Sequence, residues 1–325
     1  AADFILANNL TPNIFNLFDY GSYLIYRLYP KYRVFIDGRT ELYGKNFFAD
    51  YQKILSADEE TIERVFEQYR INTILLYGSN SQTLSQYLFD SADWALVYFD
   101  EDSTVFLKNT LENKPLIDKF KIDLRKWQTE KFDLRAIGMK AVSPESYLKR
   151  GRILFNLSLY EPSLNECRQA LRILPGADEA YNIIASIYLK QKDADLAYEN
   201  LRLARIYGPK EKQTLLNLAE FYKFEKKYKE AILVYKRLTK MSPYTGRYYF
   251  LLGQALEENN ESNLALEAFK EALKRNPYEK GYYQRLGEIL RKNKDYPAAA
   301  EVYRSAIKIG VSPKYFSQLL SDIRN

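Results

Sequence analysis

The stretch from Gly246 to Glu279 reads GRYYFLLGQALEENNESNLALEAFKEALKRNPYE, and its pattern recurs along the second half of the chain. A step of 34 residues in either direction returns the same kind of residue to the same position. One series of small residues consists of Gly151, Ala185, Ala219, Gly253 and Gly287. A second series consists of Ala197, Ala231, Ala265 and Ala299, and a series of prolines consists of Pro175, Pro209, Pro243 and Pro277. A fixed period of this length indicates a repeat architecture.

Each repeat is expected to fold as a pair of helices. The small residues allow the two helices to approach each other closely, and aromatic or aliphatic residues fill the seam between them. Proline ends the second helix, because it lacks a backbone N–H and disfavours the helical conformation in the residue before it. A single helical hairpin cannot bury its apolar face, so neighbouring hairpins stack into a superhelix.

This pattern resembles the tetratricopeptide repeat, a helix-turn-helix unit of the same length. The resemblance implies an all-α superhelix that serves as a protein-binding scaffold. It places five repeats at 144–177, 178–211, 212–245, 246–279 and 280–313, followed by a capping helix at 314–325. The first repeat departs most from the pattern, because Arg150 stands where a leucine is expected and Ser163 replaces alanine. Terminal repeats are often atypical because one side faces another structure.

Composition indicates an ordinary folded protein, with 46% hydrophobic and 28% charged residues. No apolar run approaches the roughly 18 residues of a membrane span. The chain starts at Ala1 without a methionine, and we interpret it as a processed protein or as part of a longer one. The absence of a membrane segment therefore says little about the native polypeptide.

Histidine is absent and Cys167 is the single cysteine, in a seam position of the first repeat. We interpret Cys167 as a small buried apolar residue rather than a reactive thiol. The absence of histidine removes His-based triads and most zinc sites. No glycine-rich phosphate loop occurs either. We therefore expect no metal, no cofactor and no catalytic residue in this chain, although carboxylates, lysine or tyrosine could still support catalysis.

Charge is distributed unevenly. Residues 1–143 hold 17 basic and 20 acidic side chains, whereas residues 144–325 hold 31 basic and 22 acidic ones. A basic superhelix could attract an acidic peptide, anionic lipid or nucleic acid. The alternative is a solvated, lysine-rich helical surface. The 29 tyrosines could stack on glycans or bases, but many fall on seam positions, and no RNA-binding fingerprint is present, so no nucleic-acid partner is expected.

The first part of the chain predicts a small α/β domain at 1–109. Helices are expected at 3–9, 20–29, 41–55, 60–69 and 81–89, and strands at 13–17, 33–37, 73–77, 94–100 and 104–108. Strands that alternate with helices indicate a partly parallel sheet, and the last two strands predict a hairpin. A helical connector is expected at 110–143, before the repeats begin.

Two stretches of this part carry a second resemblance. They are NLFDYGSYLIYRLYP at 16–30 and VFIDGRTELY at 34–43, and the run DWALVYFDED at 93–102 fits as well. Together they look like the soluble extracytoplasmic domain that follows the multi-span part of some bacterial GT-C-type membrane glycosyltransferases. Ser22 stands where that family usually has a second glycine. The resemblance covers about residues 1–108 and implies no catalytic residue here, because the membrane part that would hold the catalytic carboxylates is missing.

A possible ligand site lies where the predicted strand at 33–37 ends, since ligands of open α/β sheets bind at the carboxyl ends of strands. Its residues would be Asp19, Tyr20, Tyr23, Asp37, Arg39 and Glu41, which could hydrogen-bond and stack on a sugar. The alternative is an internal Asp37–Arg39 pair that locks the strand to the preceding helix, with Gly38 supplying an unusual backbone angle.

In the repeats, the first helix of each pair supplies the groove positions of the resembled family. The predicted partner-binding residues are Arg152, Asn182, Ser186, Lys190, Asn217, Glu220, Lys223, Arg247, Gln254, Arg285, Arg291 and Lys292. The family's chaperone-tail clamp is not predicted, because Asn182, Ser186 and Leu251 occupy positions where it needs other residues. The mixed polar groove suits an extended peptide or a partner helix.

These observations predict a non-catalytic extracytoplasmic region of a membrane glycosyltransferase-like protein, at the periplasmic face of a bacterial membrane, whose repeats recruit a protein or peptide. Two alternatives remain open. One is a carbohydrate-binding or carbohydrate-active α/β domain with accessory repeats. The other is a stand-alone adaptor, and the alternative location is the cytoplasm.

Overall fold

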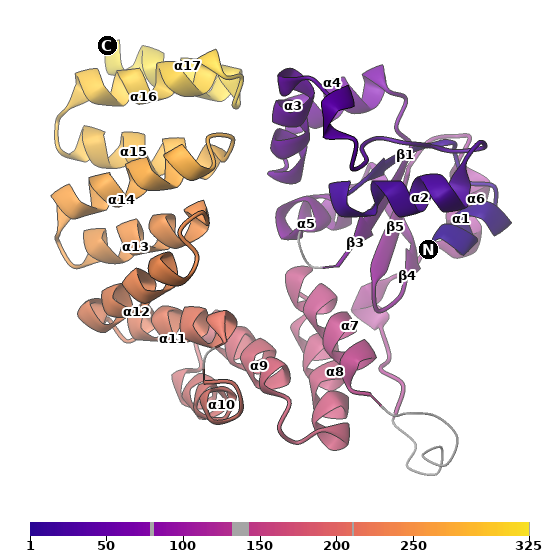
Figure 1. The fold of residues 1–325 in the computed structure, drawn as a ribbon, viewed down its shortest axis with the longest axis horizontal. Coiled ribbons are helices and arrows are strands. Elements are labelled where there is room, and N and C mark those ends of the chain that lie inside the picture. Colours follow the sequence, from indigo (N-terminus) through magenta and orange to yellow (C-terminus); the bar gives the residue numbers. More distant parts are fainter. Residues whose placement is uncertain (79–80, 132–142, 210, 325) are drawn as a thin grey trace. The chain divides into compact units, whose positions relative to one another are not determined.

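The computed structural model describes residues 1–78, 81–131, 143–209 and 211–324, and these form two compact units, Ala1–Ile183 and Ile184–Asn325 (Figure 1). The first unit contains the strands β1 (Asn13–Asn16), β2 (Arg33–Val34), β3 (Thr73–Tyr77), β4 (Trp94–Phe99) and β5 (Ser103–Lys108). Its helices are α1 (Ala2–Ala7), α2 (Gly21–Leu28), α3 (Lys45–Leu55), α4 (Glu59–Gln68), α5 (Gln82–Asp90), α6 (Lys114–Phe120), α7 (Glu145–Asn156) and α8 (Tyr160–Ile173). The predicted α/β region followed by paired helices is confirmed.

The five strands form one sheet in the order β2-β1-β3-β5-β4. β1 runs parallel to both β2 and β3, with Ile14 opposite Val34 and Thr73. β5 is antiparallel to β3 and to β4, with which it forms the predicted hairpin. The predicted partly parallel sheet is therefore correct.

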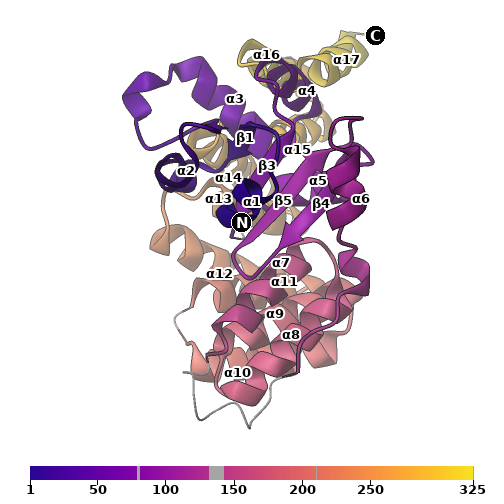
Figure 2. The ribbon, with the colours of Figure 1, turned by 90° about the vertical axis from the view of Figure 1, so that its right-hand side faces the viewer.

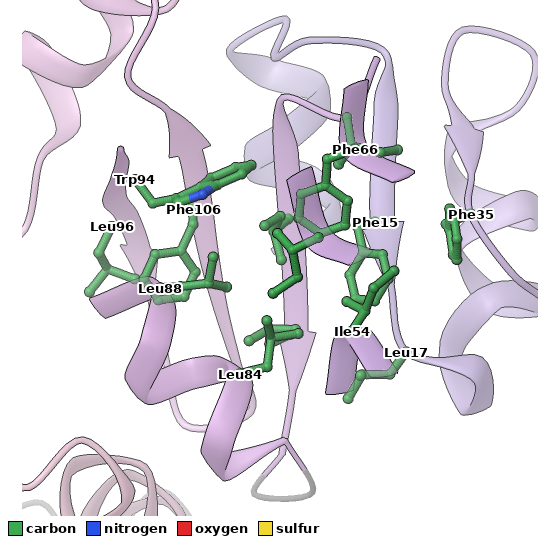
Figure 3. Packing of buried hydrophobic residues seen from close by; sticks show 14 of the residues in the cluster. Phe15, Leu17, Phe35, Ile54, Phe66, Leu84, Leu88, Trp94, Leu96 and Phe106 are labelled. Atoms are coloured by element: carbon green, nitrogen blue, oxygen red, sulfur yellow. The ribbon is translucent and has the colours of Figure 1, made fainter. Parts of the chain in front are cut away.

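Alternate residues along the strands face opposite sides of the sheet, because the side-chain period of a strand is two. On one face, Phe15, Leu96 and Phe106 pack with apolar side chains of α3, α4, α5 and α7 (Figure 3). On the other face, Ile14 and Val105 pack with α1, α2 and α6. Figure 2 shows the β4–β5 hairpin with α6 beside β4. The sheet is therefore covered on both faces and forms the middle layer of the unit.

β2 is shorter than predicted and ends at Val34 rather than at Asp37. The Phe35 amide still donates to the Ile14 carbonyl at 3.0 Å, and beyond it the buried side chain of Asn16 takes the place of backbone pairing. Its Oδ1 accepts from the Phe35 amide at 2.8 Å, and its Nδ2 donates to the Ile36 carbonyl at 2.8 Å. The helix predicted at 41–55 likewise starts only at Lys45, because Gly44 is extended, with φ −72° and ψ 162°.

The connector predicted as helical at 110–143 is helical only in part. Among the described residues of this segment, α6 and a short 3-10 turn at Leu124–Lys126 are the helical pieces. After α6 the chain leaves the helical conformation and runs beside β4. The contact that holds it there is the hydrogen bond from the Ile122 amide to the Leu96 carbonyl, at 2.9 Å. Residues 132–142 lie outside the described part of the chain.

The repeats appear as consecutive helix pairs. They continue after α7 and α8 with α9 (Asp178–Gln191), α10 (Ala194–Tyr207), α11 (Lys212–Phe224), α12 (Tyr228–Met241), α13 (Gly246–Glu258) and α14 (Ser262–Arg275). The series ends with α15 (Lys280–Lys292), α16 (Tyr296–Lys308) and α17 (Pro313–Arg324), the predicted capping helix. Figure 1 shows α11 to α17 stacked one after another, as expected for a superhelix.

The 34-residue period also governs the backbone of the turns. Positive φ angles of 57° to 64° recur at the residue between the two helices of each pair, at Ser158, Lys192, Lys226, Asn260 and Lys294. In the last turn, the Asp295 amide donates to the Leu290 carbonyl and the Lys294 amide to the Arg291 carbonyl, both at 2.9 Å. This hydrogen-bond pattern is the Schellman motif, which satisfies the carbonyls left free at a helix end.

The small residues of the first helix face aromatic seam residues of the second helix, as predicted. A Cβ atom added at Gly253 would lie 2.6 Å from the ring of Phe269, and one at Gly287 would lie 2.2 Å from the ring of Tyr303. Both rings are fully buried. The glycine of the first helix therefore leaves space on the helix surface, and the aromatic side chain of the second helix packs into that space.

The first repeat belongs to the compact unit of the sheet, and its departures from the pattern have a structural reason. Glu166 on α8 is fully buried and accepts hydrogen bonds from Arg150 at 3.0 Å and from the Trp127 indole at 2.8 Å. Ser163 donates to the Gly151 carbonyl at 2.7 Å. Arg150 thus neutralises a buried carboxylate that also holds the segment leading from the sheet. Among the described helices, none combines the length and apolarity that a membrane span requires.

Two glycines of α15 test the seam. Gly287→Ala places a methyl group against the buried ring of Tyr303 and is expected to destabilise the protein by about 1–3 kcal/mol. Gly281→Ala is the matched control, because its nearest neighbour would be the Glu279 carboxylate at 3.7 Å and alanine favours helix by about 1 kcal/mol. Chemical denaturation measures both variants. Equal effects of the two substitutions would contradict the seam assignment.

Candidate functional sites

Asp37, the centre of the predicted ligand site, is buried and bound by neighbours in the chain. Its Oδ1 accepts from the Arg39 amide and from Arg39 Nε, both at 2.9 Å. Its Oδ2 accepts from Arg39 Nη2 at 2.6 Å and from the Tyr43 hydroxyl at 3.0 Å. This geometry is that of the internal pair, the alternative left open by the sequence, and it leaves little of the carboxylate for a ligand.

The charge of Asp37 is stabilised by these contacts. The hydrogen bonds from the Arg39 guanidinium hold the pKa of the Asp37 carboxyl well below its usual range, against the opposing effect of burial. The Arg39 amide and the Tyr43 hydroxyl act in the same direction as the guanidinium. Asp37 is therefore ionised at any physiological pH.

The glycine that this corner of the fold requires is Gly21 and not Gly38. Gly38 does not adopt a positive φ, and a Cβ atom there would meet only the Ser22 hydroxyl, at 3.4 Å. A Cβ atom at Gly21 would lie 2.0 Å from the Ile36 carbonyl oxygen and 2.5 Å from Asp37 Cα. The first turn of α2 therefore lies directly on the segment that carries Asp37, which corrects the role assigned to Gly38.

Asp37→Asn is expected to lower the free energy of unfolding at pH 7 by about 2 kcal/mol, because it weakens charge-assisted hydrogen bonds in a buried position. The pKa of Asp37 is lower in the folded state than in the unfolded state, so the stabilisation is fully present above about pH 5 and is lost as pH falls further. The difference between wild type and variant should therefore shrink on acidification. Glu41→Gln, at an exposed carboxylate, serves as the control. A difference that stays constant from pH 7 to pH 2 would contradict the assignment.

A cavity of about 430 Å³ lies beyond the carboxyl ends of β1 and β3. Leu17, Asp19 and Tyr20 follow β1, and Tyr77 ends β3, with Gly78 next to it. The other lining residues are Glu101, Asp102, Lys149, Arg152, Ile153 and Glu179, from the β4–β5 turn, α7 and α9. The cavity thus collects residues from five separate segments of the first unit.

The walls of this cavity are mostly polar. The rings of Tyr20 and Tyr77 stack with their centroids 3.7 Å apart. Lys149 Nζ lies 3.0 Å from Asp102 Oδ1, and an Arg152 amino group lies 2.5 Å from Glu179 Oε1. A hydrogen bond to Tyr20, burial and a hydrogen bond to Asp102 raise the pKa of Tyr77 above its usual value, so its phenol remains protonated.

Of the six residues predicted for the ligand site, the structure brings Asp19 and Tyr20 to this cavity. Tyr23 lines a neighbouring cavity of about 310 Å³, which shares Tyr20 and Tyr77 with the first. Asp37, Arg39 and Glu41 line neither. Sequence reasoning missed Tyr77, Glu101 and Asp102, although their place at strand ends was a usable signal, and it assigned Arg152 to the groove of the repeats.

Several predicted groove residues hold neighbouring helices together. Asn217 on α11 is buried, and its Oδ1 accepts from Ser186 on α9 at 3.0 Å and from Gln213 at 2.8 Å. Glu220 accepts a hydrogen bond from Tyr235 on α12 and lies 3.5 Å from Lys223. Arg152 and Asn182 belong to the first unit.

A second polar contact joins α13 and α15. The Glu257 side chain, which is 10% exposed, lies 3.0 Å from Arg285 and 3.9 Å from Lys292. Arg285 also pairs with Glu288 at 3.1 Å. Removing Arg285 would leave a nearly buried carboxylate without its main partner, so Arg285 has a structural role whether or not it also contacts a partner. Burial raises the pKa of the Tyr303 phenol, and the positive charge of Arg291 opposes that shift.

Lys190, Arg247 and Gln254 differ from these residues. They lie on α9 and α13, in the first helix of their repeats, and form no hydrogen bond or ion pair with the described residues of the chain. Lys190 and Arg247 are also exposed. These three side chains are therefore available to a partner without loss of an internal hydrogen bond or ion pair.

Comparison with known proteins identifies the repeats. The family model described as tetratricopeptide repeat matches residues 220–280 and 250–310. The chain therefore contains tetratricopeptide repeats, as the period of 34 residues predicted, and repeats of this kind act as protein-binding scaffolds. No curated protein matches the chain.

Solved structures provide further likenesses. PilF of Pseudomonas aeruginosa is 20% identical, with 55% of this chain and 88% of that chain covered and a TM-score of 0.46. A thermophilic tetratricopeptide-repeat protein of Thermus thermophilus is 19% identical, with 56% and 98% covered and a TM-score of 0.47. YrrB, described as having an unusual peptide-binding site, is 18% identical, with 54% and 91% covered and a TM-score of 0.42.

Proposed function

We propose that the repeats bind an acidic, extended peptide segment of a partner protein through the first helices of the second to fifth repeats. The support is the set of predicted groove residues on these helices that form no hydrogen bond or ion pair within the described part of the chain, Lys190, Arg247 and Gln254. Two of the three are cationic, and the repeat half carries an excess of basic residues. A groove with free cations suits carboxylate groups of an extended peptide.

We further propose that this chain works beside a membrane, as the non-catalytic extracytoplasmic region of a glycosyltransferase-like protein on the periplasmic side. The support is the resemblance of residues 1–108 to such domains. In this arrangement the repeats tether a partner near the membrane-bound part and raise its effective concentration there. The stand-alone adaptor is the alternative, and it uses the same repeats without the membrane-bound part.

Peptide binding is tested by fluorescence anisotropy with labelled peptides of equal length that are rich in acidic, neutral or basic residues. The full chain is expected to prefer the acidic peptides. Lys190→Gln combined with Arg247→Gln should weaken that binding about tenfold, the equivalent of about 1.4 kcal/mol, because two free cations are lost. Folding should be unaffected, since neither side chain forms a hydrogen bond or ion pair with the described residues.

Arg202→Gln combined with Lys240→Gln provides the matched control. These exposed cations lie on α10 and α12, the second helices of their repeats, so the same net charge is removed elsewhere. The control should bind acidic peptides like the wild type. Equal losses in the two double variants would show that general charge, and not the first helices, determines binding.

The membrane association is tested by an immunoblot of fractionated source cells with an antibody raised against this chain. A band in the membrane fraction, much larger than 38.2 kDa, is expected. A band near 38.2 kDa in the soluble fraction would instead support the stand-alone adaptor.

A further inference from the structure

The cavity beyond β1 and β3 occupies a special place in the sheet. The connection that leaves β1 leads through α2 to β2, and α2 packs on one face of the sheet. The connection that leaves β3 leads through α5 to β4, and α5 packs on the opposite face. Because β1 and β3 are parallel neighbours, their connections diverge at this point and leave a crevice between them. Crevices of this kind are where open α/β sheets bind ligands.

The size of the cavity fits a small molecule. Its volume of about 430 Å³ falls within the range of about 300–1,000 Å³ that is usual for ligand sites. Leu17 and Ile153 are buried and form its apolar part. The stacked tyrosines stand at one side and are shared with the neighbouring cavity. The site is thus a built pocket within the first unit.

The charges of the lining residues select among ligands. Four carboxylates, those of Asp19, Glu101, Asp102 and Glu179, face two cations, those of Lys149 and Arg152. The two cations are occupied by Asp102 and Glu179. Asp19 and Glu101 have no ion pair or hydrogen bond among the described residues and leave the lining with a net charge of −2.

This charge disfavours an anionic ligand. The N-terminus of α2 begins next to Tyr20 and contributes roughly half a positive charge, which is too little to offset the excess of carboxylates. A cleft lined by one sign of charge concentrates ions of the opposite sign. Tyrosine rings add an attraction for ammonium and guanidinium groups that approach their faces. A cationic ligand therefore gains from both the carboxylates and the aromatic wall.

We infer that this cavity is a binding site for a small cationic group of the amine or guanidinium class. Asp19 and Glu101 neutralise the charge of the ligand, and Tyr20 and Tyr77 form the wall against which its apolar part lies. The site is independent of the groove of the repeats. The cation could belong to a free amine or to a lysine or arginine side chain of a polypeptide.

The test uses agmatine, which carries a guanidinium and an amine, in isothermal titration calorimetry with the full chain at low ionic strength. Glucose and inorganic phosphate are the neutral and anionic comparison probes. Agmatine is expected to bind, and the other two are not. Asp19→Asn combined with Glu101→Gln should weaken agmatine binding about tenfold. Glu41→Gln combined with Glu63→Gln removes two exposed carboxylates outside the cavity and should leave the affinity unchanged.

A second variant is expected to strengthen agmatine binding rather than weaken it. Lys149→Gln removes the cation that occupies Asp102 and is expected to tighten agmatine binding severalfold. Equal binding of glucose or phosphate, the absence of agmatine binding, or equal losses in the two carboxylate double variants would each overturn the inference. The acetylated amide of arginine mimics an arginine side chain within a polypeptide. It therefore distinguishes the two sources of the cation, a free amine and a side chain of a polypeptide. If it binds as tightly as agmatine, the ligand is a side chain of a polypeptide, whereas much weaker binding identifies a free amine.

Discussion

The close approach of paired helices at small residues is the constraint on which the repeat half depends. Gly253 and Gly287 leave room that the buried rings of Phe269 and Tyr303 fill, and smaller seam residues act alike in the earlier repeats. A larger side chain at either glycine would separate the helices, and the error would propagate because each pair packs on the next. The left-handed residue between the helices fixes how each pair turns, so the same face of every first helix recurs 34 residues later.

A close contact at a glycine, between a helix and the neighbouring backbone, also organises the sheet unit. The first turn of α2 rests on the backbone at Ile36 and Asp37, where Gly21 leaves no side chain in the way. Arg39 and Tyr43 then hold the buried carboxylate of Asp37, and this corner positions the segment after β1 that forms one wall of the cavity. The polar residues Asp37 and Arg39 therefore stabilise the fold, whereas the residues that line the cavity are others, such as Asp19 and Tyr20.

Much of this architecture could be predicted from sequence, because periodic features report directly on packing. The spacing of small residues and prolines indicated the repeats, and the β-branched run at 73–77 indicated β3 with its observed bounds. Local hydrogen bonds that replace regular ones were not predictable: Asn16 ends β2 early, and Ile122 draws the connector away from a helix. The cavity was missed for a related reason. Its residues come from segments far apart in the chain, and only the strand order brings Asp19, Tyr77 and Glu101 together.

The proposed function depends on the first helices of the repeats as the partner-binding face. Acylation footprinting of lysines, read by mass spectrometry, tests this directly in the full chain with and without its tightest-binding acidic peptide. Lys190, Lys223 and Lys292 on first helices should be protected, whereas Lys236, Lys240 and Lys270 on second helices should react as before. Protection confined to the second helices would contradict the assignment of this face.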